Sequence, residues 1–390
     1  MGCHEMSKAI RASLDKIQMS GIRKFNNRVS SIDGIIKLTL GEPDFPPPEH
    51  IKQAAIHAIE TNFTNYTPNQ GDPELLEAAE HYFTEKYHLP FHKEEIIVTV
   101  GATEAIAIAL QTILEAGDEV ILPDPIYPGY EPHIVLADAL PVKVDTTESH
   151  YKLTAEALRA AITPKTKAVI LPYPSNPTGV TMSKAELAEI AAVLEGTGIY
   201  LLADEIYSEL TYFPDGHYSI ANLLPEQTIV VNGLSKSHAM IGFRIGFLMA
   251  NKRLITEMLK VHQYTVTCAS SISQKAALEA LTNGKEDAVL MRTEYASRAQ
   301  FIEDRLKKMG FEIIPPDGAF YFFVKLPDTV PLDSFDWAVK LAEEAKVAVV
   351  PGEAFSVNGS RYFRLSYAAS FHLLVEAMER MVAFMEKQDY

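Results

Sequence analysis

Short apolar runs alternate with helical stretches through much of the chain, and this alternation limits the possible folds more than any other feature. The runs are residues 96–100, 119–122, 142–144, 168–171, 200–203 and 228–231. Helical stretches between several of them include 103–114, 154–161 and 184–194. Such alternation is typical of βαβ units, and nearly continuous apolar runs are typical of strands buried on both faces. The sequence therefore predicts an α/β fold with a mainly parallel sheet covered by helices on both sides.

The pattern changes after about residue 251. Long helical periodicity occupies residues 253–281 and 286–309, followed by strands near 320–325, 347–350 and 362–365 and helices near 334–344 and 373–387. A chain of 390 residues has room for two or three domains, since a domain has roughly 100–200 residues. We predict an N-terminal arm (1–46) that joins the small domain, a large domain (47–280) and a smaller α/β C-terminal domain (281–390).

Composition excludes several classes of protein. With 35 basic and 51 acidic residues the formal charge is −16, which disfavours binding to nucleic acid or to an anionic membrane surface. No apolar run approaches the ~18 residues of a membrane span, and the start of the chain lacks the pattern of a signal peptide. The only cysteines, Cys3 and Cys268, cannot build a disulfide framework. We expect a cytoplasmic protein with no metal site.

In open parallel sheets, ligands bind where loops leave the carboxyl ends of the strands, so the residues that follow the predicted strands are the first candidates for a site. The run 96–100 leads into Gly101, Ala102 and Thr103 at the start of a helix. Free N–H groups and the helix dipole favour an anion there, most naturally a phosphate. An ordinary helix capped by Thr103 explains the same residues.

Two further strands end at ionisable residues. Asp204 follows 200–203, and a carboxylate in that place either caps a helix or faces a cation, such as a protonated ring nitrogen. Lys236 follows 228–231 in a loop of small residues, with Arg244 eight positions later. Most lysines are solvated surface charges, whereas a desolvated one near other cations becomes a nucleophile for a carbonyl. A phosphate cradle, an acid, a reactive lysine and an arginine together are what pyridoxal 5'-phosphate requires.

At these residues the sequence resembles the class I/II aminotransferases of pyridoxal-phosphate fold type I. The resemblance covers almost the whole chain, from 41–45 (GEPDF) to 364–366 (RLS), and is most specific at 174–179 (PSNPTG) and around Lys236. It implies a large domain with a mainly parallel seven-stranded sheet and a smaller C-terminal domain. The chain departs from some branches of the family at Gly233, where they have a phosphate-binding serine, and at Tyr127, where they have tryptophan.

The resemblance also implies a role for each matching residue. Lys236 would bind the cofactor aldehyde and later move the proton, while Asp204 would pair with the ring nitrogen. Asn176 and Tyr207 would contact the ring hydroxyl oxygen, and Tyr127 would stack on the ring.

The remaining implied contacts concern the cofactor phosphate and the substrate carboxylate. The phosphate would be held by Ala102, Thr103, Arg244 and, from a neighbouring subunit, Tyr66. Ser235 would replace the serine that is missing at Gly233, or that contact would be absent. Arg364 would bind the substrate α-carboxylate with Gly41 and Asn176 close by. A homodimer with shared active sites follows if Tyr66 has this role.

Within the family the likeness is nearest to bacterial aromatic and N-acetyl-L,L-diaminopimelate aminotransferases, through residues 126–132 and 266–274. The implied reaction moves an amino group from an L-amino acid to a 2-oxo acid, 2-oxoglutarate, by a ping-pong mechanism. Recognition of an acidic side chain would need a second cation. Arg23 and Lys24 are candidates if the N-terminal arm covers the site, and solvated surface charges are the alternative. Two other functions stay open: a C–S β-lyase using the same cofactor, and a non-catalytic regulator that senses it.

Overall fold

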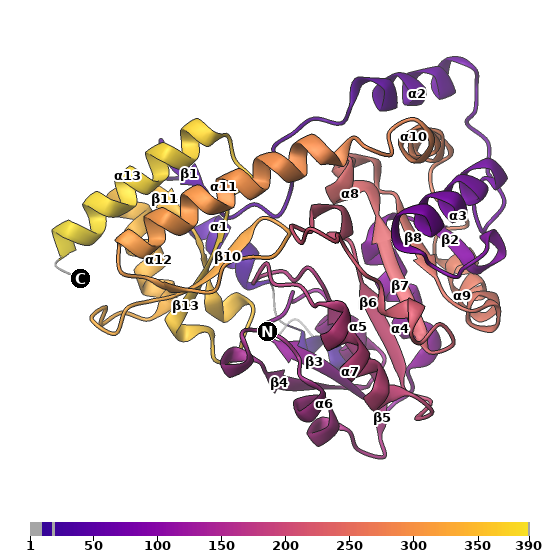
Figure 1. Ribbon diagram of the computed structural model, residues 1–390, viewed down its shortest axis with the longest axis horizontal. Helices are drawn as coiled ribbons and strands as arrows, with labels where there is room; N and C mark the ends of the chain where they lie inside the picture. Colours follow the sequence, from indigo (N-terminus) through magenta and orange to yellow (C-terminus); the bar gives the residue numbers. More distant parts are fainter. Residues whose placement is uncertain (1–9, 18–19, 389–390) are drawn as a thin grey trace, which may run out of the picture.

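The computed structural model describes residues 10–17 and 20–388, and its centre is a seven-stranded sheet (Figure 1). The strands lie in the order β2-β8-β7-β6-β5-β3-β4. Their bounds are β2 (Ile96–Thr99), β3 (Glu119–Asp124), β4 (Leu140–Asp145), β5 (Thr166–Pro172), β6 (Tyr200–Asp204), β7 (Thr228–Gly233) and β8 (Gly246–Met249). All neighbouring strands are parallel except β8, which is antiparallel to both β2 and β7. The predicted fold class, a large domain with this sheet beside a smaller α/β unit, is confirmed.

Helices cover both faces of this sheet because successive strand residues point to opposite sides. In β6, Leu202 packs with one set of helices while Leu201 and Ala203 pack with the other. One face is covered by α4 (Gly101–Ile113), α5 (Glu131–Leu136) and α9 (Lys252–Thr265). The other face is covered by α3 (Pro73–Tyr87), α6 (Ala155–Ala161), α7 (Lys184–Leu194) and α10 (Ser271–Thr282), and α2 (Glu49–Glu60) packs against α10.

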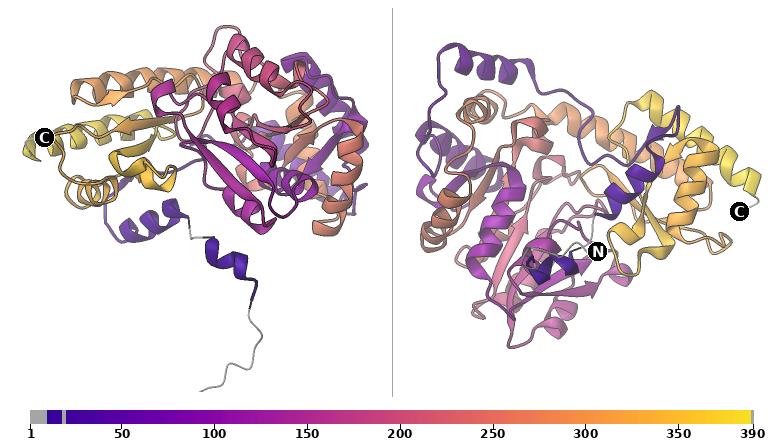
Figure 2. Two further views of the ribbon diagram at one scale, coloured as in Figure 1. Left: turned by 90° about the horizontal axis from the view of Figure 1, so that it is seen from below. Right: turned by 180° about the vertical axis from the view of Figure 1, so that it is seen from behind.

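A second, four-stranded antiparallel sheet lies beside the first (Figures 1 and 2). Its order is β12-β13-β10-β9, with β9 (Glu312–Ile313), β10 (Tyr321–Lys325), β12 (Val350–Pro351) and β13 (Tyr362–Ser366). It packs with α11 (Ala288–Lys308), α12 (Ser334–Ala345) and α13 (Phe371–Gln388). Strand β1 (Ile36–Lys37) pairs with β11 (Val347–Ala348), and Phe25 of α1 (Gly21–Val29) is buried in the same core.

The N-terminal segment therefore contributes to the core of the smaller unit, as the arm proposed from the sequence would. The domain boundaries at 46/47 and 280/281 stay a prediction. Residues 1–9, with Cys3, and residues 18–19 lie outside the described residues. Within the described part, no helix is both long enough and apolar enough to cross a bilayer.

The sequence pattern does not predict every element, and two of the differences affect the region near the site. Strand β8 was missed, since four residues after a glycine-rich loop give little periodicity. The helical stretch 253–281 is broken into α9 and α10 because Thr267 has a left-handed backbone (φ 68°) and Ser270 caps the second helix. The break brings α10 against α2 and α3 on one side of the sheet.

Candidate active site

A cavity of about 700 Å³ opens where β5, β6 and β7 end, against the start of α4 and the smaller sheet. This is the volume of an ordinary ligand pocket. All but one of the residues predicted from the sequence to form the site lie in its wall. They are Gly41, Ala102, Thr103, Tyr127, Asn176, Asp204, Tyr207, Ser235, Lys236, Arg244 and Arg364. The exception is Tyr66, which is 85% exposed in a separate loop.

Lys236 lies in the short helix α8 (Leu234–Ser237), directly after β7. Its Nζ donates a hydrogen bond to the carbonyl oxygen of Gly41 at 2.6 Å. Burial, together with the charges of Arg244 and Arg364, lowers the pKa of this amine to about 8, while Glu42 and Asp204 act in the opposite direction. A lysine with this pKa has a substantial fraction of neutral, nucleophilic amine near neutral pH.

Asp204 ends β6 and is almost fully buried. Its Oδ2 accepts a hydrogen bond from the hydroxyl of Tyr130 at 2.6 Å, and its Oδ1 accepts one from the backbone N–H of Ile206 at 3.1 Å. Burial raises the pKa of the Asp204 carboxyl, while these two hydrogen bonds act in the opposite direction. A cationic N–H group in the cavity would favour the ionised carboxylate, as the predicted role requires.

Tyr207 follows three residues later and faces the cavity. Its hydroxyl is 2.7 Å from that of Tyr321 in β10, so the two sheets meet at this contact. Burial raises the pKa of Tyr207 well above its ordinary value, so the group is a neutral phenol that can donate a hydrogen bond.

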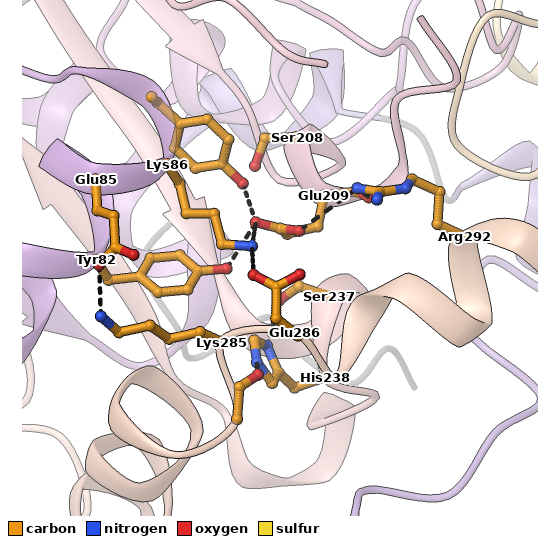
Figure 3. A network of polar contacts seen from close by, with 12 residues as sticks. Tyr82, Glu85, Lys86, Ser208, Glu209, Ser237, His238, Lys285, Glu286 and Arg292 are labelled. Carbon is orange, nitrogen blue, oxygen red and sulfur yellow. Dashed lines mark hydrogen bonds and ion pairs between the residues drawn. The ribbon is translucent and has the colours of Figure 1, made fainter. Parts of the chain in front are cut away.

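The short helix η4 (Ser208–Leu210) follows Tyr207, and a network of polar contacts surrounds its Glu209 (Figure 3). The carboxylate of Glu209 is buried and accepts hydrogen bonds from two tyrosines of α3, at 2.8 and 2.6 Å. Two cations, one from α3 and one from α11, each lie 3.9 Å from its oxygens. The partners are Tyr82, Tyr87, Lys86 and Arg292. Elements of both units thus hold the loop that carries Tyr207.

Arg364 of β13 is 2% exposed and reaches the cavity from the smaller sheet. Its guanidinium donates to Asn176 Oδ1 at 2.9 Å and to the carbonyl oxygen of Thr39 at 2.7 Å. The rings of Tyr321 and Phe355 lie 4.5 and 4.7 Å from its central carbon. Its Nε is buried with no hydrogen-bond partner. A buried, unsatisfied donor of this kind suits a carboxylate ligand.

The start of α4 forms the predicted anion cradle. The first N–H groups of a helix have no intrahelical acceptor, and Ala102 and Thr103 line the cavity. Gly101 has φ 76°, and a Cβ there would lie 2.6 Å from Nη2 of Arg244. The guanidinium therefore rests directly on the glycine at the helix start, where backbone donors and a cation face the same space.

Some residues of the site could not be found from the sequence. The hydrogen bonds of Tyr130 with Asp204 and of Tyr321 with Tyr207 could not be predicted, although Tyr130 lies in the family-like stretch 126–132. Of the two arm cations considered, Arg23 of α1 lines the cavity, whereas Lys24 lines a different hollow. The helical register of α1 separates them, and only its packing reveals which one faces the site.

Residues 33–380 match the family model described as aminotransferase class I and II. The chain belongs to this family. It is therefore an aminotransferase that acts on amino acids and 2-oxo acids, in a family whose members use pyridoxal phosphate.

Relatives of this aminotransferase include a Bacillus subtilis (strain 168) protein named "Probable N-acetyl-LL-diaminopimelate aminotransferase". The two are 53% identical over 98% of this chain and 97% of the relative. The solved aromatic aminotransferase from Pyrococcus horikoshii OT3 is 38% identical, with a TM-score of 0.88 over 94% of this chain and 99% of its own. A double mutant of the Thermus thermophilus aspartate aminotransferase is 36% identical, with a TM-score of 0.92 over 97% and 100% of the two chains.

The lowered pKa of Lys236 yields the first prediction for this aminotransferase. Only the neutral amine reacts with acetic anhydride, so labelling of Lys236 in the enzyme freed of ligand should rise with pH and level off above about 8. Competitive labelling with peptide mass mapping measures this for each lysine separately. A rate that is still rising at pH 10 would show that the amine is not desolvated.

Proposed function

We propose that this protein binds pyridoxal 5'-phosphate and transfers an amino group from N-acetyl-L,L-diaminopimelate, or from an aromatic L-amino acid, to 2-oxoglutarate by a ping-pong mechanism. The observation that carries the proposal is the desolvated Lys236 amine in one cavity with Asp204 and Arg364. These three side chains supply a nucleophilic amine, an acid for a cationic ring and a site for a carboxylate.

The donors and acceptors of the cavity fit this cofactor. The start of α4, Ser235 and Arg244 would hold the phosphate, and Tyr127 would lie against the ring. Asn176 has an amide nitrogen with no hydrogen-bond partner among the described residues, available to the ring hydroxyl oxygen together with Tyr207. When bound, the cofactor supplies an electron sink for the bonds at the substrate Cα.

Side chains of the protein would bind the substrate carboxylate, move the proton and keep the ring nitrogen protonated. Arg364 would bind the α-carboxylate through its guanidinium, which lines the cavity, and so fix the orientation of the Cα–H bond. When its amine is not bonded to another group, Lys236 would be the base that removes the Cα proton. The same amine would then be the acid that donates a proton later in the reaction. Asp204 keeps its partner nitrogen protonated, because a buried carboxylate without a cation would be costly.

The charges of the cavity favour a second anionic group on the substrate. Its wall has four cationic side chains, Arg23, Lys236, Arg244 and Arg364, against two acidic ones, Glu42 and Asp204. Arg23 makes no hydrogen bond or ion pair within the described part of the chain. It is thus available to the distal carboxylate of 2-oxoglutarate or of N-acetyl-L,L-diaminopimelate. The name of the 53% identical relative supports the latter donor, and that of the Pyrococcus structure supports an aromatic one.

A homodimer belongs to the same proposal. Tyr66 and Tyr264 are 85% and 87% exposed, which is unusual for large aromatic residues. We propose that a second copy covers this face and that Tyr66 completes the phosphate site of that copy. The cytoplasmic location inferred from the sequence stays a prediction.

The main test is a screen of amino donors with 2-oxoglutarate, and its key variant is Lys236→Ala. We expect the wild type to form glutamate from N-acetyl-L,L-diaminopimelate or from phenylalanine and tyrosine. The variant should lose a factor of about 10²–10⁴ or more in turnover, since it lacks the proton-transfer group. Near-wild-type turnover of the variant would contradict the proposal, as would release of pyruvate and ammonia from cystathionine without amino transfer.

Replacing the unpaired cavity cation tests the substrate class. Arg23→Gln should raise the KM for 2-oxoglutarate about tenfold or more, because it removes a charge-assisted hydrogen bond, and should change the KM for phenylalanine much less. Lys24→Gln removes the neighbouring charge outside the cavity and is the matched control. Equal effects of both variants would show that Arg23 acts only through general charge.

A substitution at the start of α4 tests the phosphate cradle. Gly101→Ala strains the left-handed backbone and displaces the Arg244 guanidinium, so pyridoxal phosphate should bind about tenfold more weakly. Gly117→Ala has a similar strain at φ 89° but open space around its Cβ, and should leave binding unchanged. Calorimetric titration of each cofactor-free enzyme measures the difference; equal affinities of the two variants would contradict this placement of the phosphate.

A further inference from the structure

A buried pair of ionisable side chains lies beside the cradle and takes no part in the chemistry proposed above. His262 of α9 is fully buried, and its Nδ1 is 3.0 Å from Oε1 of Glu104 in the first turns of α4. The other carboxylate oxygen, Oε2, accepts a hydrogen bond from the backbone N–H of Val100 at 2.5 Å. Glu104 follows directly after Ala102 and Thr103, the two cradle residues in the cavity wall.

The hydrogen bonds of His262 determine the charge of this pair. Its second ring nitrogen, Nε2, is 2.9 Å from the carbonyl oxygen of Asn69, which can only accept. Nε2 therefore carries a proton, and the contact between Nδ1 and Glu104 needs another. Whether that proton resides on the ring or on the carboxyl, the pair as a whole is neutral. Without His262, one backbone N–H would be the only hydrogen-bond partner of this carboxylate among the residues that the structure describes.

An uncompensated carboxylate at this place would oppose phosphate binding in two ways. Its negative charge would repel a phosphate at the start of the same helix. It would also interact with the positive end of the helix dipole, which the phosphate needs. Both effects are strong in a buried site, where water does not screen the charges.

We propose that His262 is a positioning residue for the cofactor phosphate: it neutralises Glu104 and so keeps the cradle of α4 available to a dianion. The inference rests on the proposed function, because it assumes that the cradle holds pyridoxal phosphate. His262 does not touch the cavity and acts only through Glu104 and the helix start.

The same imidazole also fixes the loop that carries Tyr66. Asn69, its second partner, lies three residues after that tyrosine, and the Asn69 side chain donates to the carbonyl oxygen of Thr267 at 2.7 Å. Gln274 of α10 donates to Thr67 Oγ1 at 2.9 Å in the same loop. One buried ring thus braces both the cradle of its own chain and the loop proposed to enter the site of a second copy.

The test compares the binding of pyridoxal 5'-phosphate and of pyridoxal to the full-length enzyme freed of cofactor. The ratio of the two dissociation constants isolates the contribution of the phosphate. We expect His262→Asn to reduce this ratio about tenfold or more, with little change in the affinity for pyridoxal. Glu104→Gln should preserve the ratio, since its amide oxygen can accept from Val100 while its amide N–H donates to a neutral His262. His50→Asn, which breaks a His–acid contact on α2, is the control for lost stability.

The double variant Glu104→Gln/His262→Asn separates charge from packing. If His262 neutralises a charge, removing that charge should restore most of the phosphate preference lost in His262→Asn. A double variant as weak as His262→Asn, or a single variant that keeps the wild-type ratio, would overturn the inference. His262→Gln provides the same comparison if His262→Asn does not fold. If the wild type itself shows no preference for the phosphorylated compound, the proposed function fails instead.

Discussion

Burial of the Lys236 amine at the carboxyl ends of the central strands costs free energy, because the charged form of a lysine is strongly hydrated. The lowered pKa of about 8 is the consequence, and the rest of the site is arranged around it. Asp204 and Glu42 offset part of the cost, while Arg244 and Arg364 add to it. With these charges around it, the Lys236 amine stays reactive, and the excess of cationic side chains in the cavity wall favours anionic ligands.

The fold makes that balance possible by bringing distant segments to one place. Parallel strands β5, β6 and β7 end at the same edge of the sheet, so Asn176, Asp204 and Lys236 follow three neighbouring strands. The smaller unit closes the other side through Arg364, whose guanidinium binds Asn176 of the larger one. The Tyr207–Tyr321 contact and the partners of Glu209 tie the two units together close to the reacting groups. In the proposed function, the larger unit would hold the cofactor and Arg364 of the smaller unit would bind the substrate carboxylate.

The sequence predicted the parts of the site that depend on local pattern. A residue directly after a buried strand must lie at the sheet edge, so the positions of Asp204 and Lys236 followed from alternation alone, and the motifs around them added the family. It did not predict Tyr130, Tyr321 or the Glu104–His262 pair, because those contacts join segments far apart in the chain. The short strand β8 was not predicted, because its four residues are too few to show a periodic pattern. The role of Tyr66 cannot be read from one chain, since the residue lies outside the cavity of its own copy.

The central claim is that one amine, that of Lys236, holds the cofactor covalently. Borohydride fixes a reversible bond between an aldehyde and an amine, so reduction of the enzyme loaded with pyridoxal phosphate, followed by digestion and peptide mass mapping, identifies the lysine directly. The account predicts a single pyridoxyl group on the peptide that contains Lys236, in close to one copy per chain. A label on another lysine, or a label spread over many of them, would contradict it.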